Sequence, residues 1–208
     1  MDVARRVAAL YPTRFLRSYV RSKVANDPVY AAVYERTNGP IVDLGCGAGV
    51  LAAYLRARGR DVPLRGVDQD ARKIAVAQRL GLRDATFTVG DAADLELRGT
   101  VVMLDLLHYL DDAARAELLR RAAATATTVI IRDAIRDGSW RYRATYVEEM
   151  FARAVRWLRV ERLNFPTREA IVDAFPGFDA EVVPLWGRLP YNNYLFVFRR
   201  SSSGMTKA

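Results

Sequence analysis

Five short apolar segments alternate with helical patterns between residues 40 and 134, and this alternation constrains the fold more than any other feature. The apolar segments cover 40–45, 63–68, 85–91, 100–107 and 127–134. They are rich in β-branched residues, which is typical of parallel strands buried on both faces of a sheet. The helices between them are expected over 48–58, over 70–80, and from residue 111 or 112 to about 125. Strands that alternate with helices predict right-handed crossovers and a doubly wound sheet.

The pattern changes on both sides of this region. Residues 1–36 are predicted to be helical, with breaks at Pro12 and Pro28, and could fold over a binding site as a lid. After residue 134, the sequence predicts helices over 144–163 and 167–174 and then strands over 180–186 and 192–200. The connection between these two strands is too short for a crossover helix, so the pair should be antiparallel.

These elements predict a Rossmann-like α/β fold, with a doubly wound, seven-stranded sheet that is mostly parallel and has an antiparallel last strand. The expected organisation is an N-terminal helical segment over 1–36, one domain over 37–200 and a disordered polar tail over 201–208. No apolar run approaches the ~20 residues that span a bilayer, and the N-terminus lacks a signal-peptide pattern. We therefore expect a cytoplasmic protein.

A glycine-rich turn, "IVDLGCGAGV" at residues 41–50, follows the first expected strand. Its spacing is Asp43-x-Gly45-x-Gly47-x-Gly49. A strand that ends in glycines and runs into a helix exposes backbone N–H groups to a ligand, which can approach closely because Cβ atoms are missing. The dinucleotide pattern G-x-G-x-x-G does not fit, because its third glycine would fall on Val50.

The glycine spacing resembles the first motif of the class I S-adenosylmethionine-dependent methyltransferases. Three further segments resemble the next motifs of that family in order: "GVDQD", "VGDAADL" and "VVMLDLLHYL". The resemblance covers residues 40–134 and implies S-adenosylmethionine as the cofactor. It also implies that Asp68 holds the ribose hydroxyls, that Asp91 accepts from the adenine amino group, and that Ala92 lies at the ring edge. Gln69 departs from the family, which often has an apolar residue against the adenine.

The residues that this resemblance assigns to the cofactor share one edge of the predicted sheet. They are Asp43, Gly45, Cys46, Gly47, Gly49, Asp68, Gln69, Asp91, Ala92, Asp105 and Leu106.

His108 is the candidate catalytic residue. It is the only histidine, and it stands just past the end of the fourth expected strand, where the reacting methyl group would lie. Its unperturbed pKa, about 6.5, suits proton removal from a hydroxyl acceptor at neutral pH. Asp105 or Asp133 could orient the ring, or His108 could only shape the pocket. A single cysteine and a single histidine exclude a Cys-rich or His-cluster metal site, so no metal is expected.

Aromatic and arginine residues gather at the same predicted edge and in the N-terminal segment, and suit a flat or conjugated acceptor with a negative charge. The acceptor-pocket candidates are Tyr11, Tyr19, Tyr109, Arg132, Arg136, Trp140, Trp186, Arg188 and Tyr191.

The net charge of +8 indicates an anionic partner, or only an arginine-rich composition. Four arginines of the long helix are candidates for contact with an acidic protein or an anionic membrane surface, or belong to a solvated face. They are Arg153, Arg156, Arg159 and Arg162. No specific nucleic acid is expected as a partner.

The favoured function is methyl transfer to oxygen or carbon of a small aromatic, lipid-like or acyl-chain acceptor in biosynthesis, with the acceptor free or linked to a carrier or lipid. An RNA methyltransferase is the alternative that the charge favours. Against it, the fourth motif is "DLLH" and lacks the Asn/Asp-Pro-Pro-aromatic sequence of base amino-group methylases. A regulatory protein that binds the cofactor without turnover is a third alternative.

Overall fold

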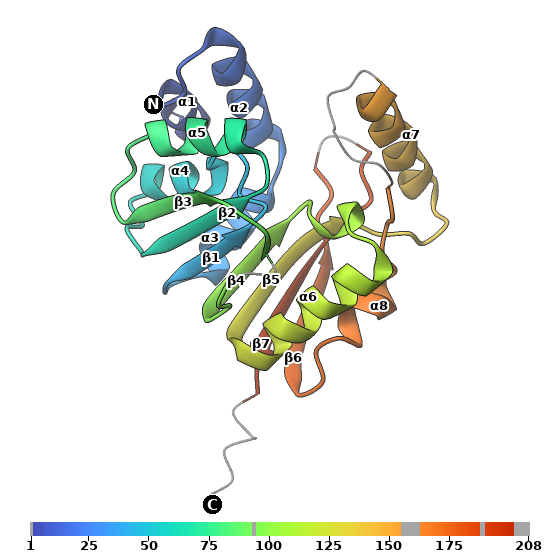
Figure 1. The fold of residues 1–208 in the computed structure, drawn as a ribbon. Helices are drawn as coiled ribbons and strands as arrows, with labels where there is room; N and C mark the ends of the chain where they lie inside the picture. The colour runs from blue at the N-terminus through green and yellow to red at the C-terminus, as the bar shows by residue number, and fades with distance from the viewer. Residues whose placement is uncertain (1, 93–94, 155–162, 188–189, 202–208) are drawn as a thin grey trace, which may run out of the picture. The chain divides into compact units, whose positions relative to one another are not determined.

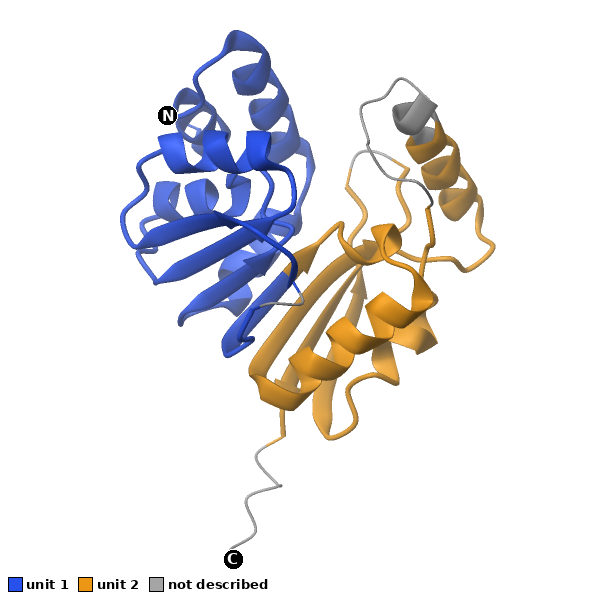
Figure 2. Cartoon of the chain, in the orientation of Figure 1, with its two compact units in different colours: residues 1–102 blue, residues 103–208 orange. Residues whose placement is uncertain are grey.

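The computed structural model describes residues 2–92, 95–154, 163–187 and 190–201 (Figure 1). The chain divides into two compact units, residues 1–102 and 103–208 (Figure 2). This division differs from the predicted boundary at residue 37, and the predicted domain limits stay a prediction. No described helix combines the length and apolar character needed to cross a membrane.

The strands form one seven-stranded sheet in the order β3-β2-β1-β4-β5-β7-β6 (Figure 1). Strands β1, β2 and β3 pair in parallel, whereas β7 pairs antiparallel with both β5 and β6. The predicted Rossmann-like fold with an antiparallel last strand is therefore confirmed. The strands are β1 (Ile41–Leu44), β2 (Leu64–Asp68), β3 (Ala85–Val89), β4 (Gly99–Leu104), β5 (Ala126–Ala134), β6 (Phe178–Pro184) and β7 (Asn193–Arg200).

The described residues of unit 1 include five α-helices, and all four residues of β1 are buried. The predicted breaks at Pro12 and Pro28 separate the first three helices. The Thr13 side chain caps the second helix by accepting a hydrogen bond from the backbone N–H of Leu16, at 3.2 Å. The helices are α1 (Val3–Ala9), α2 (Arg14–Asn26), α3 (Val29–Arg36), α4 (Val50–Ala57) and α5 (Ala71–Arg79).

Unit 2 contains η2 (Leu107–Tyr109), α6 (Asp112–Thr125), α7 (Trp140–Ala154) and α8 (Arg168–Val172). The fourth strand was predicted to reach residue 107 but ends at Leu104, because Asp105 turns the backbone into the left-handed region with φ 57°. Helix α7 begins four residues earlier than predicted, since Ser139 Oγ accepts from the Tyr142 N–H at 3.1 Å. Residues 155–162 of that predicted helix and residues 202–208 of the predicted tail lie outside the described residues, and residue 163, its predicted end, is not helical.

Candidate functional site

The glycine loop is the turn of residues 45–49 between β1 and α4. All three of its glycines lie in the left-handed region, with φ 72° at Gly45, 54° at Gly47 and 74° at Gly49. An L-residue pays roughly 1–2 kcal/mol in that region, so the turn requires glycine. The N–H groups of Gly45 and Cys46 both donate to the Val67 carbonyl, at 2.8 and 3.0 Å, which fastens the loop to β2.

Gly49 has a second constraint, because a Cβ there would lie 3.1 Å from Ala77 Cβ and 3.2 Å from the Phe87 ring. Gly59 has a similar φ of 79° but open space around it, and is a matched control. We expect Gly59→Ala to cost about 1–2 kcal/mol in unfolding free energy, and Gly49→Ala to cost a further ~1–3 kcal/mol for overpacking. Urea unfolding measures the free energy of unfolding of both variants. Equal losses would show that Ala77 and Phe87 move aside freely for the added methyl group.

Asp68 ends β2 beside the glycine loop. Its Oδ2 accepts from the Gly47 N–H at 2.9 Å and its Oδ1 accepts from the Asp70 N–H at 2.8 Å. Each carboxylate oxygen can accept more than one hydrogen bond, so both can also receive a hydroxyl. The nearest atom to a Cβ built on Gly47 is 3.9 Å away, on Lys73. A fixed carboxylate beside a loop open to close approach fits the ribose of S-adenosylmethionine.

Gln69, which departs from the family pattern, is joined to Asp91, the predicted partner of the adenine amino group. Gln69 Nε2 donates to Asp91 Oδ2 at 3.0 Å, and this bond links the segments that follow β2 and β3. Both residues are exposed and Ala92 is half-buried. Gln69 therefore takes part in this region as a polar partner of Asp91, where the family often has an apolar side chain.

Asp43, in β1, and Cys46, in the glycine loop, are both buried, with exposed fractions of 2% and 8%. Burial, followed by the charge of Asp68, raises the pKa of Asp43 to about 8. Burial also raises the pKa of the Cys46 thiol, and the charges of Asp43 and Asp68 act in the same direction. Cys46 is thus a small neutral residue at neutral pH.

The raised pKa of Asp43 predicts a pH-dependent stability. In the unfolded chain an aspartate titrates near pH ~4, so between there and about pH 8 the folded state holds the extra proton. The unfolding free energy should therefore fall as pH rises through this window. Asp43→Asn should remove more than about 1 kcal/mol of the fall between pH 5 and 8, measured by urea unfolding. If the unfolding free energy of wild type and of Asp43→Asn falls equally between these pH values, the raised pKa of Asp43 is contradicted.

Tyr11 supports the loop from the N-terminal segment. Its side chain is fully buried and its hydroxyl donates to the Ala48 carbonyl at 3.0 Å. Its own carbonyl accepts from Arg17 Nε at 2.7 Å. The sequence placed Tyr11 in the predicted acceptor pocket, and in the structure its ring is buried against the glycine loop. Tyr19, assigned with it, is exposed on α2.

In unit 2, His108 and Asp133 form a buried pair with exposed fractions of 2% and 0%. His108 Nδ1 lies 2.6 Å from Asp133 Oδ1, and Asp133 also accepts from the N–H groups of Leu107 and Ala134, each at 2.8 Å. Of the two aspartates considered from the sequence, Asp133 is the one hydrogen-bonded to the ring. A carboxylate at Nδ1 places the proton of the neutral ring there, which leaves the Nε2 lone pair available.

Two features bear on whether Nε2 can act as a base. Among the described residues, this buried nitrogen has no hydrogen-bond partner. Burial favours the neutral ring, but the charge and hydrogen bond of Asp133, together with the charges of Asp105 and Glu149, outweigh it, so the pKa of His108 is raised above its ordinary value. A buried base with a raised pKa and an open nitrogen can take a proton from a ligand.

Aromatic rings surround His108. Phe165 stacks on it with ring centres 5.2 Å apart and planes 16° apart, and Tyr109 lies 4.0 Å away. Tyr142 and Tyr146 pack against Phe165 at 5.7 and 6.3 Å. Phe165 was missed from the sequence, because no periodic pattern marks the segment before α8.

Asp105 and Arg132 form an ion pair, and the Asp105 N–H donates to the Arg132 carbonyl at 2.9 Å. The Arg132 side chain is 5% exposed, so its guanidinium, assigned to the acceptor from the sequence, is committed to Asp105. Leu106 is half-buried just before η2, and Arg136 is exposed with its N–H donating to the Pro166 carbonyl at 2.9 Å.

The other predicted acceptor residues fall into two groups. Trp140 and Trp186 are exposed and Tyr191 is half-buried. Arg188 lies outside the described residues. So do three of the arginines predicted to contact an acidic protein or membrane surface, Arg156, Arg159 and Arg162, and the side chain of the fourth, Arg153.

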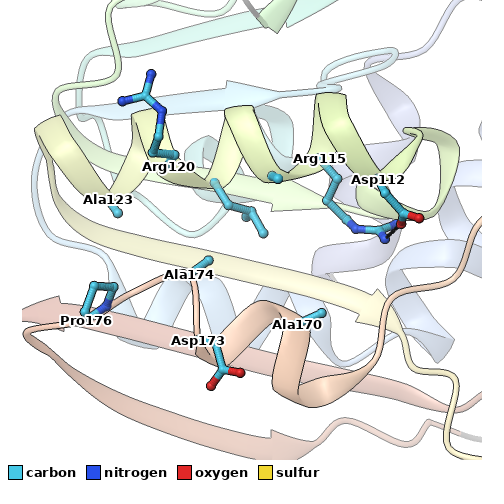
Figure 3. A pocket seen from close by; sticks show the side chains of 10 residues that line it. Asp112, Arg115, Arg120, Ala123, Ala170, Asp173, Ala174 and Pro176 are labelled. Carbon is cyan, nitrogen blue, oxygen red and sulfur yellow. Dashed lines mark hydrogen bonds and ion pairs between the residues drawn. The ribbon is translucent and has the colours of Figure 1, made fainter.

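A groove of about 550 Å³ lies between α6 and α8 (Figure 3). It is lined by four alanines, by Leu119 and Pro176, and by the charged residues Asp112, Arg115, Arg120 and Asp173. It contains none of the predicted site residues, so it is separate from the His108 ring cluster.

Residues 41–127 match the family model described as "Methyltransferase domain". The match includes the glycine loop, Asp68, Asp91 and His108. Over these residues the chain carries a methyltransferase domain. The predicted family and cofactor are thereby confirmed.

The methyltransferase domain is also similar to parts of larger proteins. Ribosomal RNA small subunit methyltransferase C of Haemophilus ducreyi is 36% identical over 78 residues, which are 38% of this chain and 20% of that protein. Trans-aconitate 2-methyltransferase of Sinorhizobium medicae is 38% identical over 73 residues, 35% of this chain and 28% of that protein. The matched residues thus make up less than a third of either relative.

The fold extends beyond that domain. The crystal structure of the PH0226 protein from Pyrococcus horikoshii has a TM-score of 0.63 and 16% identity, over 97% of this chain and 100% of that one.

Proposed function

We propose that this protein transfers the methyl group of S-adenosylmethionine to oxygen or carbon of a small aromatic, lipid-like or acyl-chain acceptor. The observation that carries the proposal is the carboxylate of Asp68 fixed to the glycine loop by the Gly47 N–H at 2.9 Å. A loop of three left-handed glycines and a carboxylate that can still accept hydroxyls suits a nucleoside cofactor.

When bound, the cofactor supplies an electrophilic methyl group on a sulfonium. The chain's own residues hold the reactants and exclude water, which is the main protein contribution in such displacements. Asp68 holds the ribose, and Gln69 with Asp91 borders the adenine. The buried Asp43 helps to shape the floor of the loop.

His108 acts on the acceptor. Its Nε2 takes the proton of an acceptor hydroxyl while Asp133 holds the Nδ1 proton and stabilises the imidazolium that forms. The tyrosine and phenylalanine rings around it supply apolar walls for a flat acceptor. A phenol, with an unperturbed pKa of about 10, would benefit from this base.

RNA is the second candidate substrate, and two observations favour it. The chain carries a net charge of +8, and one matched relative is an RNA methyltransferase. The "DLLH" sequence at 105–108 argues against a base amino group as acceptor, since it lacks the proline pair of those enzymes. We therefore rank a small acceptor first.

Incubation with methyl-labelled cofactor tests this ranking. The label should enter a small-molecule fraction. Binding of the protein to unrelated RNA should be weak and should fall steeply with salt, because counterions are released. Sequence-dependent methylation of purified RNA would reverse the ranking. Binding of the cofactor with no transfer to either class would favour a regulatory protein.

A further inference from the structure

Arg141 lies in the first turn of α7 between two exposed tryptophans. Its guanidinium carbon is 4.9 Å from the centre of the Trp140 ring and 4.4 Å from that of the Trp186 ring. The exposed fractions of the two indoles are 64% and 46%. Both contacts are within cation–π range, so the rings hold the guanidinium in place while remaining open to solvent.

The guanidinium has an unused donor. Within the described part of the chain, Arg141 Nη1 is buried and has no hydrogen-bond partner. Guanidinium N–H groups are strong donors, and buried ones in native proteins are nearly always paired. This nitrogen therefore needs an acceptor from outside the described chain.

The surroundings of Arg141 are fixed. Trp186 meets the Tyr194 ring edge-on, with ring centres 6.3 Å apart. The Ser139 hydroxyl caps the first turn of α7, and the Ser139 N–H donates to Asp137 Oδ1 at 2.9 Å. Tyr142, the next residue, packs on Phe165, which stacks on His108. One turn of helix thus carries both Arg141 and a ring of the His108 cluster.

We propose that Arg141, Trp140 and Trp186 bind a carboxylate of the acceptor. A guanidinium whose faces meet aromatic rings presents its in-plane N–H edge, and that fork matches a planar carboxylate. The indoles provide apolar surface for the flat body that carries the carboxylate. The proposal rests on the proposed function for the statement that this ligand is the methyl acceptor.

The test uses 2-naphthoate as the probe, with 2-naphthamide as its neutral analogue and 2-naphthyl phosphate as the competing oxyanion. Binding to the full chain is measured by calorimetry in the presence of S-adenosylmethionine. Naphthoate should bind about tenfold or more tightly than naphthamide. Arg141→Gln should abolish this preference, and Arg143→Gln, an exposed arginine two residues along the same helix, should leave it unchanged.

Equal binding of naphthoate and naphthamide to the wild type, or an unchanged preference in folded Arg141→Gln, would overturn the site. A preference for naphthyl phosphate that depends on Arg141 would overturn the carboxylate assignment. If Arg141→Gln does not fold, Arg141→Lys decides, because it keeps the charge but loses the fork; undiminished naphthoate binding in that variant overturns the proposal.

Cofactor binding separates this proposal from the proposed function. If the cofactor binds and naphthoate does not, the carboxylate site fails alone. If naphthoate binds through Arg141 but the cofactor does not bind, the proposed methyl transfer fails and the carboxylate site stands.

Discussion

Replacing Asp68 by alanine is expected to weaken binding of S-adenosylmethionine by one to two orders of magnitude. Two ribose hydroxyls would lose a charged acceptor, and hydrogen bonds to charged groups contribute roughly 1.5–3 kcal/mol. The substitution also leaves the N–H groups of Gly47 and Asp70 without the acceptor that now orders the loop. Isothermal calorimetry on the purified variant measures the affinity.

Glu96→Ala is a suitable control, because this exposed carboxylate in unit 1 pairs with Arg98 and is not assigned to the cofactor. The affinity of Glu96→Ala for S-adenosylmethionine should equal that of the wild type. A thermal melt establishes that Asp68→Ala is folded. Unchanged affinity in the folded variant, or tighter binding of a nicotinamide dinucleotide, would refute the assignment of the loop.

Replacing His108 by alanine is expected to lower the rate of methyl transfer to a hydroxyl acceptor by about 10²–10⁴-fold, with cofactor affinity unchanged. The substitution removes the group that takes the hydroxyl proton. The loss of rate should shrink at a pH high enough to ionise the acceptor unaided. Single-turnover rates at several pH values, with cofactor titrations alongside, measure both effects.

The pH profile gives an independent check. His108 works as a base only when neutral, and its pKa is raised by Asp133 against the effect of burial, so the wild-type rate should rise with pH through that raised pKa. Asp133→Asn removes the charge that raises it, so the rise should move to lower pH. A variant without His108 that turns over nearly as fast as wild type near neutral pH would show that the acceptor needs no base or that a tyrosine takes the proton.

The sequence by itself determined the elements that depend on local chemistry. Apolar runs of strand length, the glycine spacing and the acid at the strand end predicted β1 to β5, the glycine turn before α4 and the place of Asp68 at the end of β2. These predictions succeeded because strand patterning and glycine conformations are set by residues close together in the chain. The antiparallel β6–β7 pair was also predictable, from the length of one connection.

The tertiary structure decided which distant side chains meet. His108 pairs with Asp133, 25 residues away, and not with the nearer Asp105, whose left-handed backbone turns it toward Arg132. Tyr11 packs behind the glycine loop and Phe165 covers His108, although neither position carries a local signal. Arg132 forms an ion pair with Asp105, whereas Arg141 Nη1 is a buried donor without a partner within the described residues. Such pairings depend on strand register and on the rotation of each helix about its axis, and the local pattern of a single sequence specifies neither.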